Sequence, residues 1–370
     1  MKANEFERRE VLEAYSWKGE IREIIPYGEG NINYTYRVTA AAESGEETDY
    51  ILQRINTEVF NDPEGLMENV TGVTEYLRKY LEAHGGDPDR GTMHVIPAKD
   101  GKSFIHAEDG SSWRVMSFVT GTYCLQKAET DEDFYETAVA FGSFQNQLAD
   151  YPAETLNETI ANFHNTPARY EAFERKVSED PAGRAASVAD EIAFFRARKA
   201  DCSYLADLLA KSELPLRVTH NDTKLNNVLF DNETHKGICV IDLDTVMPGL
   251  AAYDFGDAVR YGANESAEDE PDLTKVRFNM DKYSTYLKGY LDAAGESLTP
   301  LEKETLPWGV RVMALELALR FMTDYLDGDR YFHISRPGHN LDRARNQMKL
   351  LEDIEAKFDK MQEILRTIVK

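Results

Sequence analysis

The sequence predicts an α+β fold with two lobes, a small β-rich N-terminal lobe over residues 1–119 and a larger α-helical C-terminal lobe over residues 120–370. Two observations predict it. Before residue 120, short runs of alternating apolar and polar residues are separated by Asp-Gly turns, which is typical of strands. Beyond residue 121, apolar residues recur three and four positions apart, which is the period of a helix.

In the N-terminal lobe we expect strands and one helix. The alternation predicts strands at Tyr34–Val38, Tyr50–Ile55 and Trp113–Val119. A helix is predicted over Pro63–His84, because a Gly-Gly pair follows it and glycine commonly ends helices.

In the C-terminal lobe the helical pattern is interrupted once. Apolar stripes and long helix-forming stretches predict helices near 134–148, 190–211, 281–293, 310–322 and 342–368. Between them, Val228–Phe230 and Ile238–Ile241 flank a polar turn that ends in glycine, so we expect a β-hairpin there.

The composition excludes several classes of protein. The 370 residues include 66 acidic and 42 basic side chains, a net charge of −24, which disfavours nucleic acid and anionic membranes as partners. Apolar residues at 42% and aromatic residues at 11% predict a folded chain. The three cysteines show no metal-binding spacing, and no signal peptide or apolar membrane span is visible, so we expect a cytoplasmic protein.

The predicted hairpin gathers oxygen-bearing side chains. Asn227 precedes its first strand and Asp242 follows its second, so the two should lie side by side at one end of the ladder. Asp222 lies five residues before Asn227, on the loop that leads into the same end, and Lys224 lies between them.

This cluster is suited to phosphoryl transfer. Asn227 and Asp242 are ligands that Mg²⁺ accepts, with Asp244 as a possible second carboxylate. Asp222 would orient and deprotonate the acceptor hydroxyl, and the spacing of these residues is that of kinase catalytic and metal loops. The alternative is that Asp222 and Asn227 form a turn and Asp242 caps a loop.

A literal Asp-Phe-Gly occurs at Asp254–Gly256, but it does not follow a strand that pairs back toward Asn227. We therefore interpret Asp254 and Asp257 as supports that hold the catalytic loop, or equally as N-caps of a helix. Arg260 is a candidate partner for one of them.

These motifs resemble the aminoglycoside phosphotransferase and choline kinase family, whose fold is similar to that of protein kinases. The resemblance covers essentially the whole chain and is carried by His220-x-Asp222-x4-Asn227, Ile241-Asp242 and Asp254. More narrowly, the chain resembles the N-acetylhexosamine 1-kinases in the segments 27–33, 219–227 and 241–245. That resemblance implies transfer of the ATP γ-phosphate, with Mg²⁺, to the anomeric hydroxyl of N-acetylglucosamine or N-acetylgalactosamine.

On the ATP side, a glycine-containing loop between two strands allows backbone N–H groups to approach phosphates, although a plain hairpin turn is the alternative. Arg54 is the one cation on its strand, where protein kinases have a lysine, and its pairing with a helix carboxylate such as Glu68 or Glu75 is left open. The resemblance places an adenine-binding hinge near the end of the N-terminal lobe. The predicted cofactor residues are Gly28, Gly30, Asn31, Asn33, Arg54, Ser117 and Val119.

On the acceptor side, Asn31 and Asn33 could reach the sugar or the phosphates, and Asn226 lies beside the base. The segment 319–332 also resembles the hexosamine kinases. It implies that Arg320 and Tyr331 hydrogen-bond sugar hydroxyls or the acetamido group, and it adds Asp324 to the substrate candidates. An ion pair of Arg320 with Glu316 or Asp324, each four residues away, is the alternative.

The sequence therefore predicts an ATP- and Mg²⁺-dependent sugar 1-kinase, in which Lys224 assists Asp222 and steadies the phosphates. Its partners would be ATP and a small sugar, and the chain would be a monomer or homodimer. Phosphorylation of choline, ethanolamine or an aminoglycoside is the alternative within the same fold, and a catalytically silent nucleotide-binding or scaffold protein is the alternative from another class.

Overall fold

The computed structural model describes residues 6–28 and 32–369 and confirms the α+β fold class. The chain divides into two compact units. Unit 1 comprises residues 1–123, 150–161 and 229–247, and unit 2 comprises residues 124–149, 162–228 and 248–370. The predicted boundary at 119/120 falls four residues before the first segment of unit 1 ends, and sequence analysis did not anticipate the two later segments of that unit.

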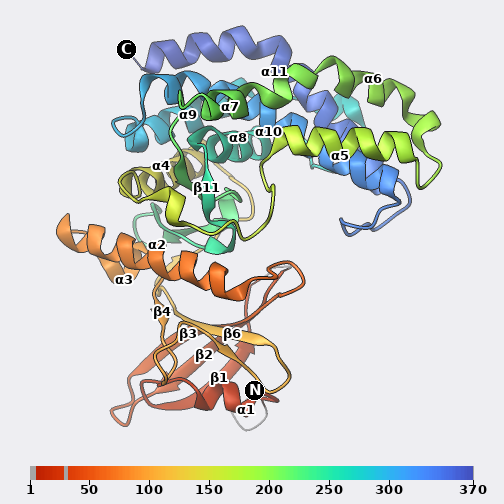
Figure 1. The fold of residues 1–370 in the computed structure, drawn as a ribbon. Coiled ribbons are helices and arrows are strands. Elements are labelled where there is room, and N and C mark those ends of the chain that lie inside the picture. The colour runs from red at the N-terminus through yellow and green to blue at the C-terminus, as the bar shows by residue number, and fades with distance from the viewer. Residues whose placement is uncertain (1–5, 29–31, 370) are drawn as a thin grey trace. The chain divides into compact units, whose positions relative to one another are not determined.

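Unit 1 is built on an antiparallel sheet with the strand order β1-β2-β3-β6-β4, and β5 pairs with β6 (Figure 1). The strands are β1 Glu20–Pro26, β2 Tyr34–Ala41, β3 Glu47–Ile55, β4 Val95–Ile96, β5 Ile105–His106 and β6 Ser112–Ser117. All three strands predicted from the alternation are present. The short helices α1 (Arg9–Glu13) and α3 (Pro88–Gly91) also belong to this unit.

The two faces of this sheet differ in character. Val38, Leu52 and Val115 lie in one apolar cluster on the first face and are fully buried. Neighbouring side chains point to the other face because side chains alternate along a strand. There Gln53 lies opposite Arg114, which reaches Met67 of helix α2.

Helix α2 (Pro63–Ala83) confirms the predicted helix and its stop signal. The Asp62 side chain accepts a hydrogen bond from the Gly65 N–H at the N-terminus, and a proline occupies the first turn. Gly85, just beyond the C-terminus, has φ of +75°, a conformation that glycine adopts without steric cost.

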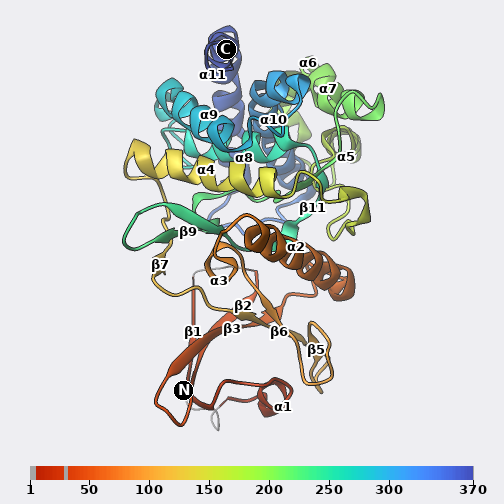
Figure 2. The same cartoon turned by 90° about the vertical axis from the view of Figure 1, so that its left-hand side faces the viewer.

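The predicted hairpin is also present. Strands β9 (Val228–Asp231) and β10 (Gly237–Val240) pair, and β7 (Thr122–Tyr123) joins β9 to give a three-stranded sheet (Figure 2). The pairing of Thr122 with Asp231 explains why residues 229–247 belong to unit 1 although they lie far along the chain.

Unit 2 is mainly helical. Its helices are α4 Asp131–Gln147, α5 Thr166–Glu179, α6 Ala189–Ala197, α7 Lys199–Ala210, α8 Ala251–Gly262, α9 Met280–Ala294, α10 Pro300–Asp327 and α11 His339–Ile368. Helix α4 packs on α9, and α10 packs on α8 and α11, around one large apolar cluster (Figure 1). A short strand, β8 (Arg217–Thr219), pairs with β11 (Met247–Gly249).

The Asp-Phe-Gly sequence has a packing role in α8. A side chain at Gly256 would overlap the backbone at Gly309 of α10, and one at Gly309 would overlap the backbone at Ala252. Phe255 is fully buried in the core. The glycine therefore allows two helices to approach closely, which supports the expectation that this segment is not a metal loop.

Among the residues that the structure describes, no helix is both long enough and apolar enough to cross a membrane.

Candidate active site

A loop over residues 220–227 in unit 2 follows β8 and ends in the short 3₁₀ helix η4 (Leu225–Asn227). Asp254 of α8 holds it. Its carboxylate accepts the backbone N–H groups of His220 and Asn221, each at 2.8 Å, and its carbonyl oxygen accepts the Thr223 hydroxyl at 2.7 Å. Asp254 lies inside α8, whose N-cap is Leu250, so the loop-holding interpretation is correct and the N-cap alternative is wrong for this residue.

Asp257 also lies inside α8 rather than at its N-cap. Its carboxylate accepts both Nε and Nη2 of Arg260, at 3.2 and 2.7 Å, which confirms the predicted pairing of Arg260 with one of the two aspartates. Arg260 is buried and also contacts Glu268 at 2.9 Å. Asp257 therefore anchors this buried cation, and its predicted role as a support of the catalytic loop stays a prediction.

The Asp222 carboxylate is fixed on both sides. Lys224 Nζ lies 2.7 Å from its Oδ1, and the Asn227 side-chain amide donates to the Asp222 carbonyl oxygen at 2.8 Å and to Oδ2 at 3.3 Å. The side chain of Asp222 remains 25% exposed, so a substrate hydroxyl can approach it. The structure thus brings together three of the predicted residues, Asp222, Lys224 and Asn227.

Lys224 is held as a cation. Desolvation favours its neutral form, but the attraction of Asp222 outweighs it and raises the pKa of Lys224, with further contributions from Asp257 and Glu268. A charged lysine beside the candidate base could also contact phosphate oxygens.

The residues predicted to hold Mg²⁺ have suitable chemistry. The Asn227 amide nitrogen is used by Asp222, so its carbonyl oxygen is the atom that would contact a cation. Asp242 is exposed and adopts a left-handed conformation, with φ of 62°, two residues after β10 ends. Asn227 belongs to unit 2 and Asp242 to unit 1, so their predicted juxtaposition stays a prediction.

Asp244, the possible second metal ligand, has contacts inside unit 1. It is buried, its Oδ1 lies 2.6 Å from Arg114 Nη2, and its Oδ2 accepts the Asn33 amide at 2.6 Å. A metal ion would have to compete with a buried guanidinium. These contacts support unit 1 internally, and the role of Asp244 as a metal ligand stays a prediction.

Arg114 is a buried cation that sequence analysis missed. Only 2% of its side chain is exposed, and it donates to Gln53 Oε1 at 3.0 and 2.8 Å in addition to pairing with Asp244. Its signal was present: Arg114 is the one charged residue of strand β6, and it lies opposite Gln53 in the register.

Arg54, the predicted phosphate-binding cation, lies on the face of β3 opposite to Gln53 and Arg114. It is exposed, and its guanidinium lies over the Tyr34 ring at 5.7 Å. Because side chains alternate along β3, Gln53 faces Arg114 and Arg54 points to the opposite face of the sheet. The strand register therefore separates Arg54 from Asp244, and its predicted role in steadying phosphates stays a prediction.

The glycine-containing loop is described in part. Gly28 has φ of +78° and follows β1, as expected for a turn between two paired strands. Gly30 and Asn31 lie outside the described residues. Asn33 is bound to Asp244 through its amide nitrogen, and its oxygen accepts the Asn56 N–H at 2.9 Å. This end of the loop is thereby tied to the segment that follows β10.

The predicted hinge uses its main-chain groups internally. The Ser117 N–H donates to the His94 carbonyl at 2.8 Å, and the Val119 carbonyl accepts the Thr122 hydroxyl at 2.9 Å. The Ser117 N–H is therefore not available to adenine, and an adenine contact here would need other main-chain groups.

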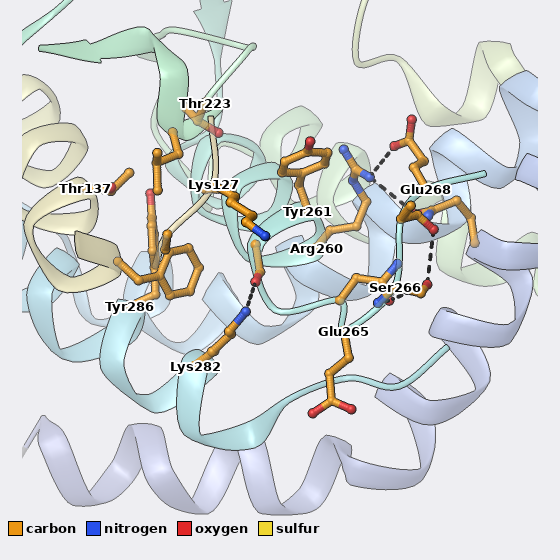
Figure 3. Close-up of a pocket in the computed structure, with 18 of the residues that line it drawn as sticks. Lys127, Thr137, Thr223, Arg260, Tyr261, Glu265, Ser266, Glu268, Lys282 and Tyr286 are labelled. Carbon is orange, nitrogen blue, oxygen red and sulfur yellow. Dashed lines mark hydrogen bonds and ion pairs between the residues drawn. The ribbon is translucent and has the colours of Figure 1, made fainter. Parts of the chain in front are cut away.

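A cavity of about 980 Å³ opens beside the catalytic loop within unit 2 (Figure 3). Thr223 and Leu225 line it, together with the C-terminal end of α8 and the acidic loop after it. Figure 3 shows Arg260 reaching the Glu268 carboxylate and Lys282 reaching a backbone carbonyl. The charged lining residues are Lys127, Glu129, Arg260, Glu265, Glu268, Asp269, Lys282 and Arg343.

The predicted acceptor residues of segment 319–332 have mixed outcomes. Arg320 lies between the rings of Phe163 and Phe332, at 5.4 and 5.6 Å. Glu316, one of the partners considered for Arg320, is instead 2.8 Å from His164. Tyr331 is 68% exposed, so its hydroxyl is accessible to a ligand. Asn226 is half-buried on η4, next to Asn227.

Asp324 is wrong as a substrate ligand. Its carboxylate accepts three backbone N–H groups, at 2.8 to 2.9 Å, and the Asn340 amide at 2.8 Å; the three are those of Arg330, Tyr331 and Phe332. With four donors and 4% exposure, it has no capacity left for a sugar hydroxyl. Asp324 shapes the loop that carries Tyr331.

Comparisons with known proteins show the family and the fold of the chain. The family model described as "Phosphotransferase enzyme family" matches residues 23–286. Among solved structures, the chain is similar to a microcompartment-associated aminopropanol kinase, with 19% identity, a TM-score of 0.61 and coverage of 96% of this chain and 97% of the other. It is also similar to an aminoglycoside phosphotransferase from Alicyclobacillus acidocaldarius (14%, TM-score 0.62, 97% and 96%). A third is the amicoumacin kinase hAmiN, solved with AMP-PNP and Ca²⁺ (15%, TM-score 0.58, 95% and 94%). These three share the fold, which is the protein-kinase-like one expected from the sequence.

Proposed function

The chain belongs to the phosphotransferase enzyme family, and we propose that it is an ATP- and Mg²⁺-dependent kinase of the anomeric hydroxyl of N-acetylhexosamines. Phosphoryl transfer from ATP to a hydroxyl group of a small molecule is the activity that this family supports. The sugar acceptor and its C1 hydroxyl are the parts that we add. The products would be ADP and the sugar 1-phosphate.

One observation carries the proposal, the arrangement around Asp222. Lys224 and Asn227 fix both oxygens of the Asp222 carboxylate, and Asp254 holds the backbone of the same loop. A fixed carboxylate can accept the proton of an acceptor hydroxyl and orient its oxygen toward the transferred phosphoryl group. Lys224 then offsets negative charge as it develops on the phosphate oxygens.

The Mg²⁺ ion would be held by the carbonyl oxygen of Asn227 and the carboxylate of Asp242. When bound, Mg²⁺ neutralises phosphate charge and completes its coordination with water and phosphate oxygens. Glycine at position 28 and the loop after it would supply backbone N–H groups to the nucleotide.

The charge of the cavity favours a neutral polar acceptor. Its lining has four basic and four acidic side chains, and three of the carboxylates already have partners. Glu268 pairs with Arg260, Asp269 with His339, and Glu265 accepts the Asn279 amide. The aromatic rings of Phe134, Tyr261 and Tyr286 also line the cavity, but a cationic acceptor such as choline needs carboxylates as well as rings that face it, whereas a sugar can hydrogen-bond to a balanced set of donors and acceptors.

The experiment is an ADP-release assay with Mg·ATP across N-acetylglucosamine, N-acetylgalactosamine, galactose, choline, aminopropanol and an aminoglycoside. Turnover with the N-acetylhexosamines is expected to exceed turnover with every other acceptor. D222N should lower kcat by about 10²- to 10⁴-fold while binding of Mg·ATP, measured by calorimetry, is retained. A preference for choline, aminopropanol or the aminoglycoside would replace the sugar with a cationic acceptor. Mg·ATP binding without ADP release from any acceptor would support the catalytically silent alternative.

A further inference from the structure

A buried histidine contacts the loop that carries Asp222. His164 precedes α5, and its side chain is 7% exposed. Its Nδ1 lies 2.8 Å from Glu316 Oε1, and its Nε2 lies 3.3 Å from the carbonyl oxygen of Asn221. Both atoms that face the ring are oxygen acceptors, since an ionised carboxylate and a backbone carbonyl have no proton to donate.

This geometry specifies the protonation state of His164. A neutral imidazole carries one N–H, whereas two hydrogen bonds to acceptors require an N–H on each nitrogen. Burial alone would lower the pKa of His164, but the Glu316 carboxylate outweighs burial and raises it. Burial raises the pKa of Glu316, and the attraction of His164 outweighs that and lowers it. His164 and Glu316 therefore form a buried pair of opposite charges.

The other groups around His164 come from two helices. Arg320 lies on α10, as Glu316 does, and disfavours the imidazolium, while Asp257 of α8 favours it. The Tyr253 ring of α8 lies 5.6 Å from the imidazole ring. Burial raises the pKa of Tyr253, so this phenol stays neutral. Glu316 is thus the dominant charged partner.

The contact with Asn221 acts on the peptide bond that precedes the candidate base. Asn221 adopts the left-handed conformation, with φ of 65°, which asparagine tolerates better than most residues other than glycine. His164 binds the carbonyl oxygen of the peptide group between Asn221 and Asp222. The N–H of the same peptide group, which belongs to Asp222, donates to His220 Nδ1 at 3.3 Å. Two histidines therefore clamp the peptide group from its two sides.

We propose that His164, held by Glu316, is a positioning residue that fixes the peptide plane between Asn221 and Asp222 and so sets the direction of the base. This inference rests on the proposed role of Asp222. It also links the catalytic loop to α10, where Arg320 lies one helical turn after Glu316. Without the clamp, the peptide can rotate and the carboxylate no longer points at the acceptor hydroxyl.

Three variants separate positioning from stability. H164A removes the clamp, whereas H164Q keeps a side-chain N–H that can bind the Asn221 carbonyl. T166V is the matched control, because the Thr166 hydroxyl donates to Glu316 Oε2 at 2.6 Å without contacting the loop. Each is assayed for ADP release with the best acceptor of the wild-type protein, and each is corrected for its folded fraction from circular dichroism.

H164A should lower kcat by about 10- to 100-fold, the cost of a misplaced catalytic group, with KM for Mg·ATP changed less than about twofold. H164Q should recover most of kcat, and T166V should lose stability with kcat retained. H164A with wild-type kcat, or H164A and T166V that lose kcat equally, would overturn the inference. An inactive wild-type protein would instead count against the proposed function.

A second measurement does not depend on activity. In ¹⁵N NMR spectra of the full chain recorded across a pH titration, the imidazole of His164, assigned by its loss in H164Q, should carry a proton on each ring nitrogen and should lose one only above the ordinary histidine pKa of about 6.5. A neutral tautomer at or below that pH would overturn the inference even if H164A were inactive.

Discussion

Replacing Asp254 with asparagine, D254N, removes one of the two acceptors that hold the catalytic loop. In the wild-type protein, the two carboxylate oxygens of Asp254 accept the backbone N–H groups of His220 and Asn221, each at 2.8 Å. The asparagine oxygen can still accept one of these N–H groups, but the asparagine NH₂ then faces the second one and cannot accept it. Leaving a buried donor without an acceptor costs about 1–3 kcal/mol. Burial raises the pKa of Asp254, because a buried negative charge is unfavourable. The neutral side-chain amide of the asparagine avoids this cost, which offsets part of the loss.

We therefore expect the free energy of unfolding to fall by only about 1 kcal/mol, at the low end of that range. The effect on kcat should be larger, about 10- to 100-fold, because the freed N–H belongs to the segment that carries Asp222. Urea denaturation measures the first quantity and ADP release the second. The exposed residue Asp207 on α7 provides the control, D207N, which should change neither. D254N with wild-type kcat would refute the view that Asp254 acts through the loop.

The remaining predictions concern the buried pairs and the metal. R114A should lower the free energy of unfolding by about 3–5 kcal/mol, because it leaves Asp244 buried without its cation. R54A removes only an exposed contact with an aromatic ring, so it should lower the free energy of unfolding by less than about 1 kcal/mol. Urea denaturation of both variants tests this difference. The pKa of His164 is raised on folding, so its stabilisation is full below about pH 6.5 and is lost as pH rises through the folded value. The pKa of Glu316 is lowered, so its stabilisation is full above about pH 4.3 and is lost as pH falls through the folded value. The stability difference between wild type and H164Q should therefore be largest between these pH values and should decrease as pH rises through the folded pKa of His164, and a constant difference would contradict the ion pair. EDTA should abolish ADP release, and excess Mg²⁺ should restore it; activity in EDTA would remove the metal from the proposal.

The local pattern was sufficient to predict the features that depend on neighbouring residues. The hairpin followed from two short apolar runs and a polar turn, and the convergence of Asp222, Lys224 and Asn227 followed from their closeness along the chain. From the sequence, support of the loop and N-capping of a helix were equal interpretations of Asp254, because both roles use a carboxylate near the start of a helix. The position of Asp254 within α8 decided between them.

Features that depend on distant contacts could not be predicted in this way. Arg114 and Asp244 are 130 positions apart, and only the strand register shows that Arg114 rather than Arg54 faces this carboxylate. The misassignment of Asp324 has the same cause, because a carboxylate next to a loop looks available until its four donors are known. His164 belongs to no recognisable motif in the sequence, since its partner Glu316 lies 152 residues away.

The central claim is that Asp222 directs the ATP γ-phosphate to the anomeric hydroxyl of an N-acetylhexosamine. Phosphorus NMR of the product from N-acetylglucosamine, Mg·ATP and the wild-type protein tests it most directly, with D222N as the control. The account predicts a sugar phosphate whose phosphorus couples to the anomeric proton, and no such signal with D222N. A 6-phosphate, or a 1-phosphate formed equally by D222N, would contradict it.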